Sequence, residues 1–135
     1  MKKRTAATLL CLATAFATAA LADDAEFQGW MKKTGGTMGK LRKEVDAKAF
    51  SDVATDANAL AEVFKSVESY FAKSHTDDAV TMAQGSQAAA KKLAEAASAG
   101  NADEVAAGLK GVAASCGGCH TAHREKLPEG GYKIK

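Results

Sequence analysis

The scarcity of helix breakers in a long alanine-rich stretch is the strongest constraint on how this sequence folds. The chain has 135 residues and a single proline, Pro128, which follows every segment with periodic apolar residues. Alanine has the highest helix propensity, and the chain lacks the runs of valine, isoleucine and threonine that favour strands. The sequence therefore predicts an all-α fold.

Apolar residues recur at helical spacing in four segments, which span about residues 24–45, 51–73, 77–99 and 102–126. Ser51 is expected to cap the second helix and Gly100 to end the third, while Asn101 and Glu104 have the spacing of a capping box before the fourth. Short connections between helices of this length favour antiparallel neighbours. An up-down-up-down four-helix bundle is therefore expected.

The first 22 residues have the pattern of a cleavable secretory signal. Basic residues at 2–4 precede an apolar stretch at 6–16, and small residues lead to a cleavage site after Ala22. The apolar stretch is too short to span a bilayer, so we expect no membrane anchor. The mature chain, residues 23–135, should be a single domain exported to the periplasm.

Charge and composition narrow the function of the mature chain. Without the three basic residues of the leader, 15 basic residues remain against 16 acidic ones, a formal charge of −1. Such a chain has no basic patch for nucleic acid. Its apolar stripes are rich in alanine, so the core is thin unless a buried macrocycle fills it; close alanine-lined helix packing is the alternative.

The motif CGGCH, from Cys116 to His120, carries the chemistry of this sequence. Cys-x-x-Cys followed by His is typical of covalent c-type haem attachment, in which the cysteines form thioethers and the histidine ligates iron. On a helix, Cys116, Cys119, His120 and His123 fall within a ~100° arc. We therefore expect one covalent haem c held by Cys116 and Cys119, with His120 as the iron ligand.

Three other uses of these residues are weaker. A structural zinc site made by both cysteines, His120 and His123 lacks the second ligand pair that usually comes from another element. A thiol redox pair would sit at a helix N-terminus, whereas this motif is near a C-terminus. A plain disulfide is the third alternative, since Cys11 is expected to leave with the leader.

The second axial position of the iron has one favoured candidate, Met31. In the expected bundle the first and last helices are antiparallel neighbours, and the level of His120 then matches residues 30–32. Met38 lies on the same face but ~10.5 Å further along the axis, and His75 is expected in a loop. Ordinary core packing of Met31, with five-coordinate iron, is the alternative.

The chain resembles the class II cytochromes c, which include the cytochromes c′ and their low-spin relatives, and it is most similar to the low-spin members with His and Met ligands. The resemblance rests on a single CxxCH on the last of four helices, on Arg124 four residues after His120, and on WMKKTGGTM in the first helix. It implies that Arg124 lies near the haem edge, and homodimers formed through the first two helices are common. Phe27 departs from the pattern, because many members carry arginine there.

These expectations lead to one main function, electron transfer, and one alternative, gas binding. With His120 and Met31 both bound, the iron stays six-coordinate in both oxidation states, which suits a carrier of electrons between transiently docked redox partner proteins. Without Met31, the resemblance implies a five-coordinate binder of NO or CO. We expect no enzymatic activity, since no carboxylate pair, nucleophile or phosphate loop is evident.

Overall fold

The structure, a computed structural model, describes residues 24–135 in full and residues 5–23 only as part of the first helix. The elements in chain order are α1 (Thr5–Asp46), α2 (Phe50–Lys73), α3 (Asp77–Ser98), α4 (Ala102–His123), β1 (Arg124–Lys126) and β2 (Tyr132–Ile134). The predicted signal peptide lies outside the fully described residues. No helix in the described part of the chain is long and apolar enough to cross a membrane.

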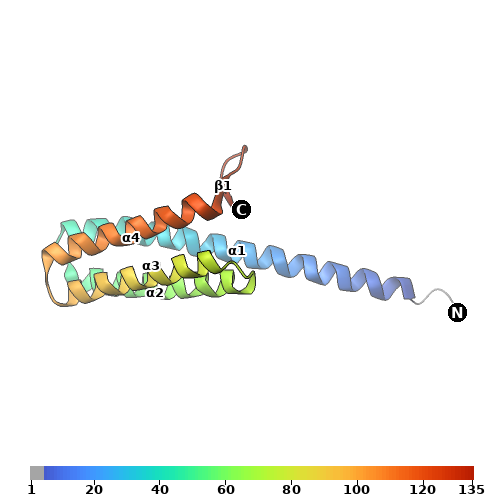
Figure 1. The fold of residues 1–135 in the computed structure, drawn as a ribbon, viewed down its shortest axis with the longest axis horizontal. Helices are drawn as coiled ribbons and strands as arrows, with labels where there is room; N and C mark the ends of the chain where they lie inside the picture. The colour runs from blue at the N-terminus through green and yellow to red at the C-terminus, as the bar shows by residue number, and fades with distance from the viewer. Residues whose placement is uncertain (1–4) are drawn as a thin grey trace.

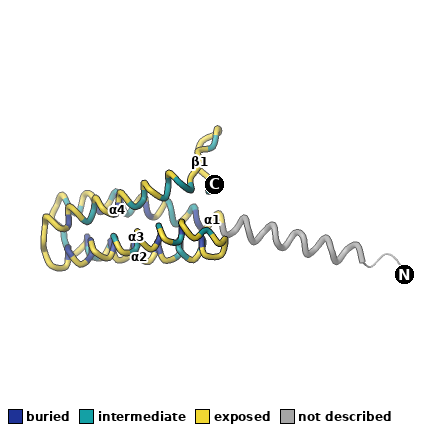
Figure 2. The backbone as a smooth tube through the Cα atoms, in the orientation of Figure 1, coloured by how far each residue is buried: buried dark blue, intermediate teal, exposed yellow. Residues whose placement is uncertain are grey.

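The four helices form the predicted antiparallel bundle (Figure 1). α3 packs against both α2 and α4, and α1 packs against α2, whereas α1 and α4 touch each other only sparingly. Buried residues gather on the inner faces of the helices and exposed residues outside (Figure 2). The sparse contact between α1 and α4 leaves room between the first and last helices.

Local sequence signals explain some of the helix ends. The Asn101 side chain accepts a hydrogen bond from the Glu104 backbone N–H at 3.3 Å, as the predicted capping box requires. Gly100 follows α3 with φ +71°, the left-handed conformation of a glycine cap. The predicted Ser51 cap is wrong, because α2 already begins at Phe50 with Ala49 as its cap residue. The predicted end of the last helix near residue 126 is also wrong, because Arg124 is extended.

The end of the bundle where α1 leads into α2 holds a tightly packed core, which we call the closed end. Its most deeply buried side chains are Leu41, Val53, Leu60, Leu93, Val105 and Val112, all less than 2% exposed. Gly108 of α4 lies against α3, and a Cβ atom there would meet the Cα of Leu93 at 3.1 Å. Glycine at this position therefore permits the close approach of α3 and α4.

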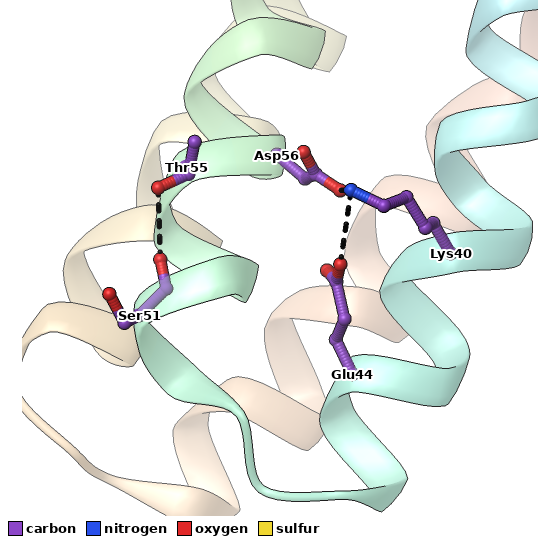
Figure 3. A network of polar contacts seen from close by, with 5 residues as sticks. All are labelled: Lys40, Glu44, Ser51, Thr55 and Asp56. Atoms are coloured by element: carbon purple, nitrogen blue, oxygen red, sulfur yellow. Dashed lines mark hydrogen bonds and ion pairs between the residues drawn. The ribbon is translucent and has the colours of Figure 1, made fainter.

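A polar network ties α1 to α2 on the surface of the closed end (Figure 3). Lys40 Nζ lies 2.7 Å from Asp56 Oδ2 of α2 and 3.4 Å from Glu44 Oε1 of its own helix. Glu44 is mostly covered and its Oε2 has no hydrogen-bond partner. Burial, together with the nearby Asp56 carboxylate, raises the pKa of Glu44 above its ordinary value.

A short β-hairpin ends the chain, although the sequence predicts no strand. Arg124 pairs with Ile134 and Lys126 with Tyr132 in an antiparallel ladder. The turn needs glycine because Gly130 and Gly131 have φ of +96° and +82°. The hairpin folds back, and Ile134 packs against a cluster formed by α1, α2 and α3.

Candidate functional site

A cavity of about 300 Å³ opens between the four helices and the hairpin, at the end of the bundle opposite the closed end. We call this the cavity end. Every residue predicted to take part in the site lines the cavity: Met31, Cys116, Cys119, His120 and Arg124. The structure thus brings together side chains that lie up to 93 residues apart in the sequence.

The two cysteines of the motif lie on the α4 wall, one helical turn apart. Cys116 and Cys119 are free thiols and each is half-buried, which disagrees with the disulfide alternative. Burial raises the pKa of both thiols above the ordinary value. The intervening Gly117 and Gly118 face open space, since a Cβ at either would meet nothing within 4 Å. Both sulfurs are therefore available on the cavity side of the helix.

His120 follows directly on the same wall. Burial, and then the positive charge of Arg124, lower the pKa of His120 below its ordinary value. A lowered pKa favours the neutral imidazole, which keeps the nitrogen lone pair that binds a metal. The electrostatics of this position therefore suit an iron ligand.

The fourth member of the motif's arc, His123, has a different partner. Its Nε2 lies 2.9 Å from Asp78 Oδ2 at the start of α3, and its ring is 5.7 Å from that of Phe71. Among the described residues, no three His, Cys, Asp or Glu side chains gather as a metal site would require. The set proposed for zinc is therefore not assembled.

The opposite wall comes from α1 and α2 and is apolar. Phe27 takes the place of the arginine common in the resembled family, is 7% exposed, and stacks with Trp30, Tyr70 and Phe71 at centroid distances of 4.7 to 6.2 Å. Phe64 and Val67 of α2 continue this wall. A flat hydrophobic group would find aromatic and aliphatic contacts along this side.

The two α1 methionines differ in their surroundings. Met31 is half-buried at the cavity end, while Met38, which also reaches the cavity, is 6% exposed and belongs to the core of the closed end. The helix ends used to match Met31 with His120 were misplaced, because α4 stops at His123 and α1 starts before residue 24. The two side chains nevertheless line one cavity. His75 lies exposed in the loop after α2, as expected.

The hairpin supplies a wall that the sequence analysis missed. Arg124 places its Cζ 3.9 Å from the centroid of the Tyr132 ring, a cation–π contact. Gln28 of α1 donates a hydrogen bond to the Tyr132 carbonyl at 3.4 Å, and the Lys135 N–H donates to the His123 carbonyl at 3.1 Å. The local signal was the Gly130–Gly131 pair, which is typical of a hairpin turn.

The residues of the cavity fit a covalently attached haem. The free thiols of Cys116 and Cys119 share one wall with His120, whose lowered pKa favours the neutral imidazole, and the facing wall is mostly hydrophobic. In addition, the hydroxyl of Thr34 in the cavity lining is buried without a hydrogen-bond partner. An antiparallel four-helix bundle with this set at the end of its last helix defines the class II c-type cytochromes.

The family comparison agrees with this class. A family model described as Cytochrome C′ matches residues 24–124, well over half of the chain. The chain therefore belongs to the cytochrome c′ family. Proteins of this family carry a covalently attached c-type haem, so haem c is the cofactor of this chain. The match ends where the hairpin begins.

Solved structures show the same fold at low sequence identity. Cytochrome c′ from Thermochromatium tepidum has a TM-score of 0.64 and 21% identity, covering 74% of this chain and 92% of its own. A nitric oxide complex of a variant of cytochrome c prime from Alcaligenes xylosoxidans has a TM-score of 0.66 and 22% identity, covering 77% and 94%.

A third structure, a cytochrome c′ with ligand-controlled dimer dissociation, has a TM-score of 0.66 and 21% identity, covering 84% of this chain and 95% of its own. A search of curated proteins found no match.

Proposed function

We propose that this protein is an exported monohaem cytochrome that binds a small neutral gas, NO or CO, in the cavity. Cys116 and Cys119 would hold the haem through thioethers, and His120 would ligate its iron. When bound, the haem would supply an iron that can take a diatomic ligand. The chain's own contribution is to fix the macrocycle against α4, exclude water and leave room on the other side. No catalytic step is proposed.

The observation that carries this proposal is the apolar wall facing the motif. Phe27 of α1 and Phe64, Val67 and Phe71 of α2 present uncharged side chains to the cavity. Neutral diatomic gases enter such surroundings at little cost, whereas water and anions are disfavoured there. The nitric oxide complex of a protein with the same fold supports this assignment.

Met31 favours a second candidate function, electron transfer. It lines the same cavity as His120, and its thioether is an iron ligand known to raise the reduction potential in cytochromes c. If it bound the iron, the centre would stay six-coordinate and closed to gases. The protein would then pass electrons to redox partners through small, transient interfaces. Arg124, stacked on Tyr132 beside His120, would border that interface at the haem edge.

Absorbance spectra of the holoprotein with and without CO distinguish the two functions. For gas binding, we expect a five-coordinate ferrous spectrum that shifts on adding CO, and no change of coordination in Met31→Leu. A wild-type spectrum indifferent to CO, together with a Met31→Leu variant that takes up CO, would instead establish the electron carrier. Met38→Leu is the matched control, because it removes a sulfur that packs in the core.

Export to the periplasm is part of the proposal. The family match begins at residue 24, just after the predicted cleavage site. N-terminal sequencing of the secreted holoprotein should start at Asp23. Sedimentation analysis with and without CO would test whether this chain forms a homodimer, since a relative of the same fold shows ligand-controlled dimer dissociation.

A further inference from the structure

In the described part of the chain, Thr34 is the buried threonine whose hydroxyl has no hydrogen-bond partner. Threonine in a helix usually donates its hydroxyl proton to the carbonyl four residues earlier. Thr55, Thr81 and Thr121 do so, each at 3.0 Å. Thr34 is 7% exposed and its Oγ1 has no partner of any kind.

A buried hydroxyl without a partner costs free energy, so such groups normally find a protein atom or another acceptor. The second buried atom of this kind in the described residues, Glu44 Oε2, belongs to the surface network of the closed end. Thr34 instead lines the cavity, one helical turn after Met31. Its missing partner is therefore expected in the cavity.

Several other polar side chains around the cavity already have partners. Gln28 donates to the hairpin and Ser86 Oγ to the Met82 carbonyl at 3.1 Å. His123 pairs with Asp78, and Lys133 Nζ lies 3.3 Å from Glu125. Arg124 stacks on Tyr132. Thr34 differs from these groups because its hydroxyl is buried and has no hydrogen-bond partner among the described residues.

We propose that Thr34 is a specificity-determining residue, whose hydroxyl donates a hydrogen bond to the diatomic ligand held in this cavity. This inference deepens the gas-binding function proposed above and rests on it. In an otherwise apolar wall, a single O–H donor favours ligands whose outer atom accepts a hydrogen bond, and it slows the dissociation of such ligands. Thr34 would thereby tune which gas is retained, without contributing to haem attachment.

The test uses the ferrous CO complex of the holoprotein, with Thr34→Val as the isosteric change. A hydrogen bond to bound CO weakens the C–O bond, so its loss should raise the C–O stretching frequency measured by infrared spectroscopy. CO should also dissociate about two- to tenfold faster, as expected for one hydrogen bond. Thr81→Val is the matched control, since Thr81 is exposed and bonded to its own helix.

Both measurements are repeated in the Met31→Leu background, which lacks the Met31 sulfur that could ligate the iron. If wild type excludes CO but Met31→Leu admits it, the gas-binding function fails while Thr34 remains testable in the second protein. An unchanged C–O stretch and dissociation rate on adding Thr34→Val to Met31→Leu would overturn the role of Thr34. A shift there, absent with Thr81→Val, supports it.

Discussion

At the closed end of the bundle, leucine and valine side chains from all four helices fill the interior, whereas at the cavity end large aromatic side chains line a space that no protein atom fills. Leu41 and Leu93 are fully buried at the first end. At the second, Met31 and His120 remain half-exposed to the cavity. At the closed end, small and branched side chains let the helices approach one another. At the cavity end, Phe27 of α1 packs on Phe71 of α2, and α4 stays apart from α1, so a pocket is left between them.

This difference shows how one short bundle can be both stable and open. Burial of side chains at the closed end contributes stability that does not depend on any ligand. The cavity end lacks part of its packing until the haem is attached, because void surfaces lose the dispersion contacts that a filled core provides. We therefore expect the stability of the closed end to be intrinsic and that of the cavity end to depend on the cofactor.

The largest effect should follow from Cys116→Ala combined with Cys119→Ala. Without either thiol no thioether forms, and haem should be lost from the protein completely after acid–acetone extraction or on a denaturing gel stained for haem. Hydrogen exchange should then become fast for amides of α4 near His120, while the amides around Leu60 stay protected.

Wild-type holoprotein is the reference for this comparison, and the single Cys116→Ala variant is the intermediate case with one thioether. Equal loss of protection at both ends in the double variant would show that the closed end has no independent stability. Haem that resists extraction in the double variant would contradict the assignment of these two cysteines.

A smaller effect, on the free energy of unfolding, should come from replacing two glycines of α4, one packed against α3 and one facing open space. Gly108→Ala places a Cβ 3.1 Å from the Leu93 Cα, and such overpacking typically costs about 1–3 kcal/mol. Gly111→Ala meets nothing within 4 Å and should instead stabilise the helix by up to about 1 kcal/mol.

Urea unfolding followed by circular dichroism measures both glycine variants, and the C–O stretch reports on the cavity. Opposite signs of the change in unfolding free energy, with an unchanged stretch, are expected. If Gly108→Ala were neutral, the close approach of α3 and α4 would not be tight in solution.

The smallest effect concerns Glu44 of the surface network. Its pKa is raised in the folded protein, so the native state holds the proton more tightly than the unfolded chain does. Stability should accordingly fall as the pH rises from the ordinary value of 4.5 through the raised one. Glu44→Gln removes this part of the pH dependence and should stabilise the protein at neutral pH by less than about 1 kcal/mol.

Unfolding curves recorded from about pH 4 to about pH 8 cover the range in which a carboxyl group with a raised pKa titrates, and they measure this difference. Glu62→Gln serves as the control because Glu62 is exposed and pairs only with Lys65. An identical change in slope for both variants would mean that burial of Glu44 has no electrostatic consequence.

Much of the fold could be predicted because it depends on local signals. Helical periodicity located all four helices, and Asn101 and Gly100 marked the junction of α3 and α4 correctly. The haem c cofactor followed from CGGCH, since that spacing serves few other purposes. These inferences need only neighbouring residues, which a single sequence displays.

The remainder depends on contacts between distant residues. Ser51 has the chemistry of a cap, yet the chain enters α2 two residues earlier. The hairpin strands have three residues each, too few for a period, and they are held by Gln28 and by packing of Ile134 far along the chain. The unpartnered hydroxyl of Thr34 could not be predicted either, since it is defined by what surrounds it.

The hairpin also has a mechanical consequence. The last residues of a chain are usually the loosest, but here Lys135 is tied to α4 through the His123 carbonyl and Tyr132 to α1 through Gln28. The C-terminus therefore acts as a brace across two helices that otherwise barely touch. A fusion partner or affinity tag attached at Lys135 would disturb these two hydrogen bonds, so a tag is better placed elsewhere in the chain.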